Sequence, residues 1–491
     1  MASAPDIPDP LPTRTDVLIV GAGPAGLTLA AGLSQLGVDH VLIDRGSMVR
    51  PGSKAAAVQP RTLEYLERIG VSARLVQAGA QGRGFRLHDC EDTLLTATYE
   101  GLDTPYPYVL LISQQTTEEH LARRLGELGG VVHRDHTFLE MAPDFPGVTA
   151  TIAGPDGVLR ALSARYVVGC DGVHSAVRTA AGIGFPGQAH EQLFAIADVR
   201  LGPGTDAVPK EDTTFFLSPD GMLLVSPLAG GQHRIVGRAS GPAAPTADDV
   251  EMMLADRGPR TGDIRVKEVV TASTYRVQER VAERFRDGPV FLVGDAAHTH
   301  SPAGGQGMNA GIQDAGNLAW KLHAVLTGLA PCELLDSYHR ERHPIAAGLV
   351  AFTSQFAKLA NVRDPLAGGL RNRVLAAAGA VPGFAGWITA KLSQLDLGYS
   401  QEPDHGAPRV GGRVPPRLVP SAGLRWTLAL PGGEVPEPPT EHGVLAVRHV
   451  PGLGTPLLVR PDGYLAAHGV PAASAVVLDR LSQYLPLNPT R

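Results

Sequence analysis

Short runs of apolar residues recur along the first part of the chain and predict buried parallel strands. Asp16 to Val20 is the first run, a glycine-rich turn and a predicted helix over 24–36 follow it, and Val38 to Ile43 is the second run. Unbroken apolar runs are typical of strands that are covered on both faces. A strand, a helix and a strand in this order predict a parallel unit. Apolar runs over 166–170 and 290–294 predict two further strands.

The pattern changes between about Phe185 and Phe285, where polar and apolar residues alternate between Pro and Gly turns. Alternation over 213–217 and 222–225 predicts an antiparallel sheet, and part of residues 72–112 is a candidate for the same sheet. Apolar residues that recur every three or four positions predict helices over 59–69, 116–128 and 309–326, and helical patterning continues to about Leu395.

Composition and charge narrow the classes of function. The 491 residues allow two or three domains. The net charge of −6 disfavours nucleic-acid and anionic-membrane partners. The three cysteines, Cys90, Cys170 and Cys332, are too far apart for a redox pair or a zinc site. Residues 1–15 are predicted to be a disordered leader without a secretory signal, and we expect a cytoplasmic protein.

The glycine-rich turn carries the first chemical motif. Gly21 permits a tight turn, Gly23 lets the backbone approach a pyrophosphate, and Gly26 allows close packing of helix and strand. The helix that starts here offers amide donors and the positive end of its dipole. Asp44 ends the next strand, where a carboxylate can accept hydrogen bonds from ribose hydroxyls. The motif predicts a dinucleotide site and fits FAD and NAD equally.

Two later motifs also place a carboxylate at the end of a predicted strand. In Gly169-Cys170-Asp171-Gly172 the carboxylate belongs to Asp171. In residues 293–309 it belongs to Asp295, and a glycine-rich loop then opens a helix whose dipole can face a negative charge. His298 and His300 lie in this second motif without a third metal ligand nearby, so we expect a structural role for both and no metal site.

The three motifs, in this order, resemble the class A flavoprotein monooxygenases, the p-hydroxybenzoate hydroxylase family, and most of all its members that oxidise aromatic polyketides. The resemblance covers residues 16–395 and implies an α/β fold. It comprises a Rossmann-like FAD-binding domain over 16–184 and 286–395, and an antiparallel-sheet substrate domain over 185–285. Residues 457–464 resemble the end of the thioredoxin-like domain of these enzymes, so we expect a linker over 403–420 and such a domain over 421–491, with a last helix near 474–485.

The resemblance also implies roles for single residues. Asp44 should hold the FAD ribose, Asp171 should lie near the pyrophosphate and the nicotinamide path, and Asp295 should contact the ribityl chain or pyrophosphate. The carbonyl of Pro302 should face the reactive edge of the flavin, as the one candidate catalytic group. Lys54 stands where many members have arginine. The remaining predicted cofactor-binding residues are Gly21, Gly23, Pro24, Ala25, Gly26, Arg45, Arg61, Gln114, Phe138, Gly305, Gln306, Gly307, Met308 and Asn309.

In such enzymes NADPH or NADH reduces FAD, and O2 then gives a flavin C4a-hydroperoxide that hydroxylates an electron-rich ring. The substrate should be an aromatic polyketide or a related phenol, bound near Phe215, Phe216 and Met222. The alternatives are a Baeyer–Villiger-type oxygen insertion, a flavin dehydrogenase, a non-catalytic flavoprotein and a flavin-dependent halogenase. The halogenase is disfavoured because Trp320, Trp387 and Trp426 lie far apart in the sequence. A homodimer is a candidate assembly.

Overall fold

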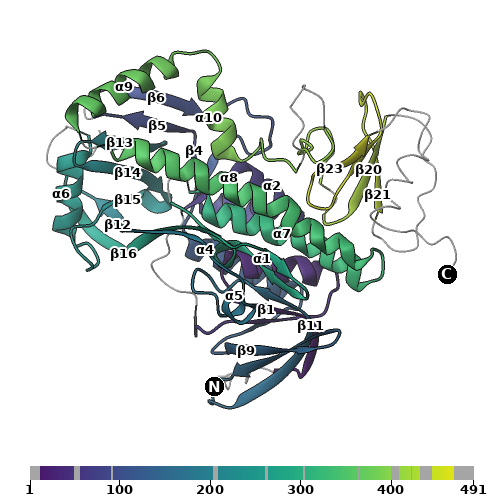
Figure 1. The fold of residues 1–491 in the computed structure, drawn as a ribbon. Helices are drawn as coiled ribbons and strands as arrows, with labels where there is room; N and C mark the ends of the chain where they lie inside the picture. Colours follow the sequence, from purple (N-terminus) through teal and green to yellow (C-terminus); the bar gives the residue numbers. More distant parts are fainter. Residues whose placement is uncertain are drawn as a thin grey trace, which may run out of the picture.

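The computed structural model is mixed α/β, as the sequence predicts (Figure 1). The described residues are 11–48, 56–89, 92–202, 208–259, 264–301, 305–362, 364–399, 409–421, 423–431 and 445–468. Within them, the strands form two eight-stranded sheets, one four-stranded sheet and one three-stranded sheet. Residues 1–10 of the predicted leader, Lys54, Pro302, residues 403–408 of the predicted linker and the predicted last helix lie outside the described residues.

The first large sheet holds the predicted parallel core. Its strand order is β17-β18-β11-β1-β2-β8, and β1 pairs in parallel with both β2 and β11. The strands are β1 (Arg14–Val20), β2 (His40–Ile43), β8 (Val132–His133), β11 (Leu159–Gly169), β17 (Arg286–Asp287) and β18 (Val290–Leu292), with β9 (Thr137–Asp144) and β10 (Gly147–Ala153) as an antiparallel extension of β11. Leu18 and Ile19 are fully buried, which agrees with a strand covered on both faces.

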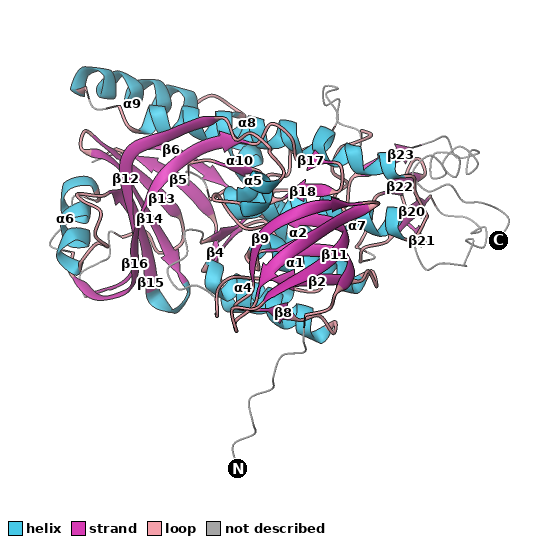
Figure 2. Ribbon diagram, turned by 60° about the horizontal axis from the view of Figure 1, so that its bottom comes forward, coloured by secondary structure: helices cyan, strands magenta, loops and turns pink. Residues whose placement is uncertain are grey.

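The second large sheet is mostly antiparallel, with the order β19-β16-β12-β15-β14-β13-β5-β6. Its strands are β5 (Gly84–His88), β6 (Thr93–Thr98), β12 (Gly187–Leu201), β13 (Thr213–Ser218), β14 (Gly221–Leu228), β15 (Gln232–Arg238), β16 (Val266–Val281) and β19 (His298–Thr299). Strands β5 and β6 come from within 72–112, so the chain enters this sheet twice. Helix α6 (Ala247–Arg257) packs against the sheet, and α9 (Pro365–Gly379) and α10 (Phe384–Ser393) lie beside β6 (Figure 2).

Long helices link the two large sheets to the C-terminal sheet. Helix α7 (Gly307–Leu326) packs against α1 (Pro24–Gln35), and α8 (Asp336–Ala360) runs alongside α7 in the middle of Figure 1. The C-terminal sheet, drawn in yellow, has the order β21-β20-β22-β23. Its strands are β20 (Trp426–Leu430), β21 (Leu445–His449), β22 (Leu457–Val459) and β23 (Leu465–His468). The Trp426 ring packs edge-on against Trp320 of α7, with ring centroids 5.5 Å apart, so α7 contacts the core of this sheet.

The remaining elements are short. They are α2 (Pro60–Arg68), α3 (Ser72–Ala78), α4 (Gln114–Glu127), α5 (Ala176–Ala180), the three-stranded sheet of β3 (Ala57–Val58), β4 (Ala80–Gly82) and β7 (Val109–Leu111), and the 3-10 turns η1 (Ala229–Gly231), η2 (Gly294–Ala296) and η3 (Cys332–Leu335). No single described helix is long and apolar enough to cross a membrane; one pair of segments, Leu366–Gly379 and Phe384–Ser393, bent by 95°, passes the same test of length and composition together.

Candidate active site

A cavity of about 730 Å³ extends between the two large sheets. Residues from the ends of β1 and β2 line one part of it, and side chains of β13, β14, β15 and β16 line another. This volume lies within the range that binds cofactors and drug-sized ligands, roughly 300–1,000 Å³. A position beyond the carboxyl ends of parallel strands is where ligands bind in open α/β sheets. We therefore treat the cavity as the candidate active site.

The glycine turn between β1 and α1 forms one end of the cavity. Gly21 has a φ of 105° and lies so close to Cys170 that an added Cβ would stand 2.4 Å from the Cys170 carbonyl oxygen. A Cβ on Gly26 would collide with the backbone of Gly21, whereas one on Gly23 would meet nothing within 4 Å. Gly21 and Gly26 thus serve close packing, and Gly23 leaves open space on the cavity side. No side chain caps α1 at Gly23, so its first amides are available to an anion.

Asp44 holds the glycine turn and also lines the cavity. Its carboxylate accepts hydrogen bonds from the amides of Ala22 and Gly46, both at 2.7 Å. The Arg134 guanidinium lies 3.8 Å from the same carboxylate. The first motif therefore places a hydrogen-bonded carboxylate beside the open face of Gly23.

Asp171 lies two residues after β11 and lines the cavity. One oxygen, Oδ2, accepts from the amides of Ala176 and Val177 at 2.7 and 3.2 Å, at the start of α5. The other oxygen, Oδ1, is buried and has no hydrogen-bond partner among the described residues. Burial raises the pKa of this carboxyl group. A buried acceptor without a partner is rare in proteins, so Oδ1 marks a place for a ligand donor.

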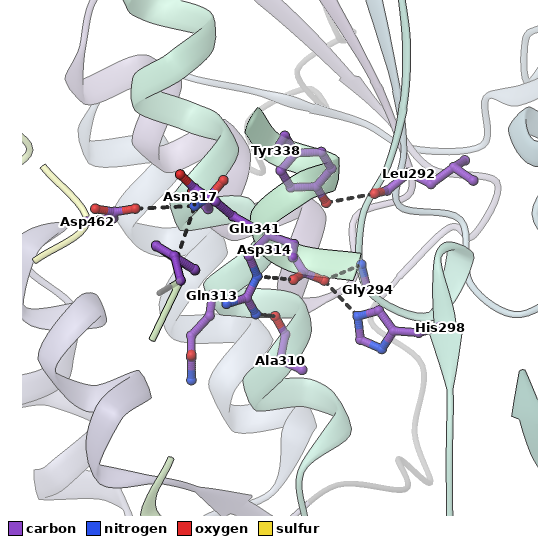
Figure 3. Close-up of polar contacts among 12 residues, drawn as sticks. Leu292, Gly294, His298, Ala310, Gln313, Asp314, Asn317, Tyr338, Glu341 and Asp462 are labelled. Atoms are coloured by element: carbon purple, nitrogen blue, oxygen red, sulfur yellow. Dashed lines mark hydrogen bonds and ion pairs between the residues drawn. The ribbon is translucent and has the colours of Figure 1, made fainter. Parts of the chain in front are cut away.

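A buried ion cluster behind the cavity fixes the turn that carries Asp295 (Figure 3). Asp314 of α7 accepts from the Gly294 amide at 3.2 Å and lies 2.8 Å from His298 Nε2. Arg342 of α8 donates to the other oxygen of Asp314 at 2.6 Å. Burial alone would raise the pKa of Asp314, but Arg342 and His298 outweigh burial and lower it. Asp295 itself is exposed and lines the cavity, next to Gly294, whose amide the cluster holds.

The glycine-rich loop at the start of α7 is anchored from both sides. Asn309 donates to the carbonyls of Gly305 and Ala57 at 2.7 and 2.9 Å and accepts from the Gln59 amide at 2.8 Å. Asn309 is therefore a buried support of the loop and does not line the cavity. His300 does line it, and its Nε2 has no hydrogen-bond partner in the part of the chain that the structure describes. Burial lowers the pKa of His300, which favours the neutral form of its ring.

The wall opposite these groups is one face of the second sheet. Phe215 of β13 and Met222 of β14, two of the three predicted substrate contacts, line the cavity. The third, Phe216, does not line it, because successive residues of a strand point to opposite faces. Phe216 instead packs among Val225, Ile235 and residues of α6 on the other face.

The structure also moves Arg61 away from the predicted cofactor site. Its guanidinium donates to the Asp462 carbonyl at 2.6 Å, pairs with Glu64 at 3.1 Å and lies over the Tyr464 ring. It is buried between α2 and the C-terminal sheet and does not line the cavity. Gly26 serves packing alone. The other predicted cofactor residues that are described all line the cavity: Gly21, Gly23, Pro24, Ala25, Asp44, Arg45, Gln114, Phe138, Asp171, Asp295, Gly305, Gln306, Gly307 and Met308.

The sequence analysis missed several residues of the lining. Arg234, Ser226 and Thr213 form a polar group on the sheet wall, and Tyr275 and Phe85 add aromatic surface. None of them lies in a motif, and the only available signal was the strand alternation that separates Phe215 from Phe216. No group of three His, Cys, Asp or Glu side chains suited to a metal ion occurs among the described residues.

The fold and the site define a dinucleotide-binding α/β enzyme with a second, mostly antiparallel sheet. A model of the family described as "FAD binding domain" matches residues 14–353. The chain belongs to this family and is an FAD-dependent monooxygenase of the class A type.

Known relatives agree over most of the chain. The 12-dehydrotetracycline 5-monooxygenase/anhydrotetracycline 6-monooxygenase of Streptomyces rimosus subsp. rimosus is 36% identical over 416 residues, covering 82% of this chain and 80% of that protein. The pentachlorophenol 4-monooxygenase of Sphingobium chlorophenolicum is 32% identical over 469 residues, covering 91% and 86%. The solved structure of OxyS, an anhydrotetracycline hydroxylase from Streptomyces rimosus, has a TM-score of 0.80 at 34% identity and covers 96% of this chain and 99% of that one.

The residues at the cavity fit FAD. Phosphate oxygens suit the open side of Gly23 and the uncapped amides of α1. Hydroxyl groups suit the carboxylates of Asp44 and Asp295 and the unpartnered oxygen of Asp171. These acceptors and donors lie along one continuous cavity, as an extended dinucleotide requires.

Proposed function

We propose that this FAD-dependent monooxygenase hydroxylates an aromatic polyketide or a related phenolic ring, with NADPH or NADH as electron donor and O2 as co-substrate. The main observation in support is that one continuous cavity extends from the dinucleotide-binding turn to the apolar and aromatic side chains of the sheet wall. The names of the relatives support this substrate class, because they give 12-dehydrotetracycline, anhydrotetracycline and pentachlorophenol as the compounds that those enzymes oxidise.

Each part of the chain has a task in this reaction. When bound, FAD supplies the redox chemistry with NAD(P)H and O2. The amides at the start of α1 and the carboxylates of Asp44, Asp171 and Asp295 bind and orient the cofactor. Gly305, Gln306, Gly307 and Met308 would face the ring system of the bound flavin, with Asn309 supporting the loop from behind. Phe85, Phe215 and Met222 would pack against a planar substrate and exclude water.

We also propose that the C-terminal sheet is the described part of a thioredoxin-like domain. In support, β20 and β21 are parallel, and β22 and β23 continue the sheet as an antiparallel hairpin. Because no cysteine follows Cys332, such a domain would have no redox pair. The predicted cytoplasmic location and homodimer remain predictions.

The experiment follows oxygen from labelled O2. Holoenzyme is incubated with NADPH or NADH, 18O2 and anhydrotetracycline, the compound in the name of one relative, or pentachlorophenol as the phenolic probe. We expect one 18O atom on a ring carbon of the product and substrate-stimulated NAD(P)H oxidation. An ester with labelled oxygen would indicate Baeyer–Villiger insertion. An oxidised product without label would indicate a dehydrogenase and would overturn the proposal.

A further inference from the structure

Arg234 of β15 is a buried arginine on the sheet wall that the dinucleotide does not explain. Its side chain is 4% exposed and lines the cavity. Nε and Nη2 donate to the two carboxylate oxygens of Asp198 on β12, at 2.7 and 2.8 Å. The third nitrogen, Nη1, is buried and has no hydrogen-bond partner among the described residues. A buried donor without a partner is costly and rare in proteins, so a ligand acceptor is expected there.

The register of the strands places Arg234 in a polar row at one end of the wall. It lies opposite Ser226 of β14 and Asp198 of β12. The Ser226 hydroxyl is 2.9 Å from the hydroxyl of Thr213 on β13, and both residues line the cavity. The next row of the same face contains Phe215, Leu224 and Val236. A ligand that lies on this wall therefore meets apolar side chains over its rings and hydrogen-bonding groups at one edge.

Charge decides which acceptor suits this row. Asp198 balances the positive charge of Arg234, and Thr271 adds a hydrogen bond to the same carboxylate at 3.2 Å. A carboxylate bound to Nη1 would bring a second negative charge to a pair that is already neutral, and buried uncompensated charge is costly. A carbonyl oxygen accepts from Nη1 and adds no charge.

We propose that Arg234, with Ser226 and Thr213, binds a neutral carbonyl oxygen of the substrate, such as a ring ketone or quinone, and selects against a carboxylate at this position. This inference rests on the proposed function, because it requires an aromatic substrate on the sheet wall. Arg234 thereby sets specificity: it fixes which edge of a fused-ring ligand lies at the polar row.

Three probes with one carbon skeleton test the inference on the holoenzyme without reductant. They are 1-hydroxyanthraquinone, 1-hydroxyanthracene, which lacks the carbonyls, and anthracene-1-carboxylate, which has a carboxylate and no ring carbonyl, and their Kd values are read from the change in flavin absorbance. We expect the hydroxyanthraquinone to bind about tenfold more tightly than the other two, which corresponds to about 1.4 kcal/mol. Arg234→Met should remove this preference and leave 1-hydroxyanthracene unchanged. Asp198→Asn should leave Arg234 with a net positive charge and raise the affinity for the carboxylate about tenfold.

The controls separate specificity from folding and from catalysis. Arg200→Met removes an exposed arginine of the same sheet, paired with Glu268 at 3.1 Å, and should change no Kd. If Arg234→Met does not fold, the double variant Asp198→Leu/Arg234→Met removes both charges together. Tightest binding of the carboxylate to the unmodified protein, or an unchanged hydroxyanthraquinone Kd in the variants, overturns the inference. If no 18O enters the product but the expected order of Kd values is found, the hydroxylation proposal is overturned and the proposed carbonyl site is not.

Discussion

Two buried polar regions of this protein differ in how completely their charged side chains are paired. The interface cluster lies between α2, α7, α8 and the C-terminal sheet and consists of Arg61, Glu64, Lys321, Glu341, Arg413, Arg460 and Asp462. Each of its charged side chains contacts an opposite charge. In the cavity, by contrast, Asp171 Oδ1, His300 Nε2 and Arg234 Nη1 are buried without a hydrogen-bond partner among the described residues.

The difference separates groups that hold the fold from groups that await a ligand. A buried charge with its partner satisfied contributes to the structure that surrounds it, and removal of one partner is strongly destabilising. A buried polar atom without a partner is a cost that binding of a ligand can remove. Substitutions in the interface cluster should therefore change stability, whereas substitutions at the unpartnered cavity groups should change ligand affinity.

The largest effect is expected for Glu341→Leu in the interface cluster. Glu341 accepts from Lys321 at 2.8 Å and from both terminal nitrogens of Arg460 at 2.8 and 2.9 Å. Its loss leaves the fully buried ammonium of Lys321 without its carboxylate, which should lower the free energy of unfolding by about 3–5 kcal/mol. Urea denaturation measures this change.

The matched control is Glu268→Leu, which removes an exposed partner of Arg200 and should cost less than about 1 kcal/mol. The FAD affinity of folded Glu341→Leu protein should stay unchanged. A large loss of FAD affinity at unchanged stability would contradict the division between the two regions.

The second effect is expected for Asp171→Asn in the cavity. The amide oxygen can still accept from Ala176 and Val177, but the NH2 group replaces the free acceptor Oδ1. We expect the Kd for FAD to rise by about 10- to 100-fold, which corresponds to about 1.4–2.8 kcal/mol. Flavin fluorescence measures the Kd, and thermal unfolding of the FAD-free protein should show little change.

Asp156→Asn serves as the control, because Asp156 pairs with Arg160 in an exposed hairpin far from the cavity lining. Its Kd for FAD should equal that of the unmodified protein. If Asp171→Asn instead lowers the stability of the FAD-free protein and leaves the Kd unchanged, Oδ1 belongs to the fold and the comparison fails.

The sequence predicted the dinucleotide end of the site because its chemistry is local. Gly21, Gly23 and Gly26 lie within six residues, and Asp44 ends the next strand, so spacing alone brings them together. The sheet wall was harder to predict. Phe215 and Phe216 are both aromatic, and only the alternation of the strand determines which one faces the cavity. The sequence showed that Phe215 and Phe216 point to opposite faces of the strand, but it did not show which face lines the cavity.

The remaining misses come from contacts between distant parts of the chain. Arg61 was assigned to the cofactor, yet its main partner is Asp462, 401 residues away. Arg234 was overlooked because its pairing with Asp198 depends on the register of two antiparallel strands. Neither contact has a signal in local spacing, since both arise only when separate elements pack together. A buried arginine in a sequence therefore indicates a partner but does not identify it.

The smallest expected effect is a pH dependence of stability from Lys321. Burial lowers its pKa to about 8, although Glu341 acts in the opposite direction. In the unfolded chain the pKa returns to about 10.4. Between about pH 8 and 10.4 the lysine is protonated in the unfolded chain and mostly neutral in the folded protein. The free energy of unfolding therefore rises with pH across this window, and this gain is lost as the pH falls through about 8. Relative to Lys321→Met, the unmodified protein should gain about 1–2 kcal/mol between pH 8 and 10.

Urea denaturation of both proteins at half-unit pH intervals measures this difference, and titrations shared by the two proteins cancel in it. Lys391→Met provides the matched control for removal of a lysine, because Lys391 is 40% exposed beside Asp396, whereas Lys321 is fully buried. If the free energy of unfolding of the unmodified protein relative to Lys321→Met falls between pH 8 and 10, the ion pair with Glu341 outweighs burial. Lys321 would then stabilise the interface cluster as a cation.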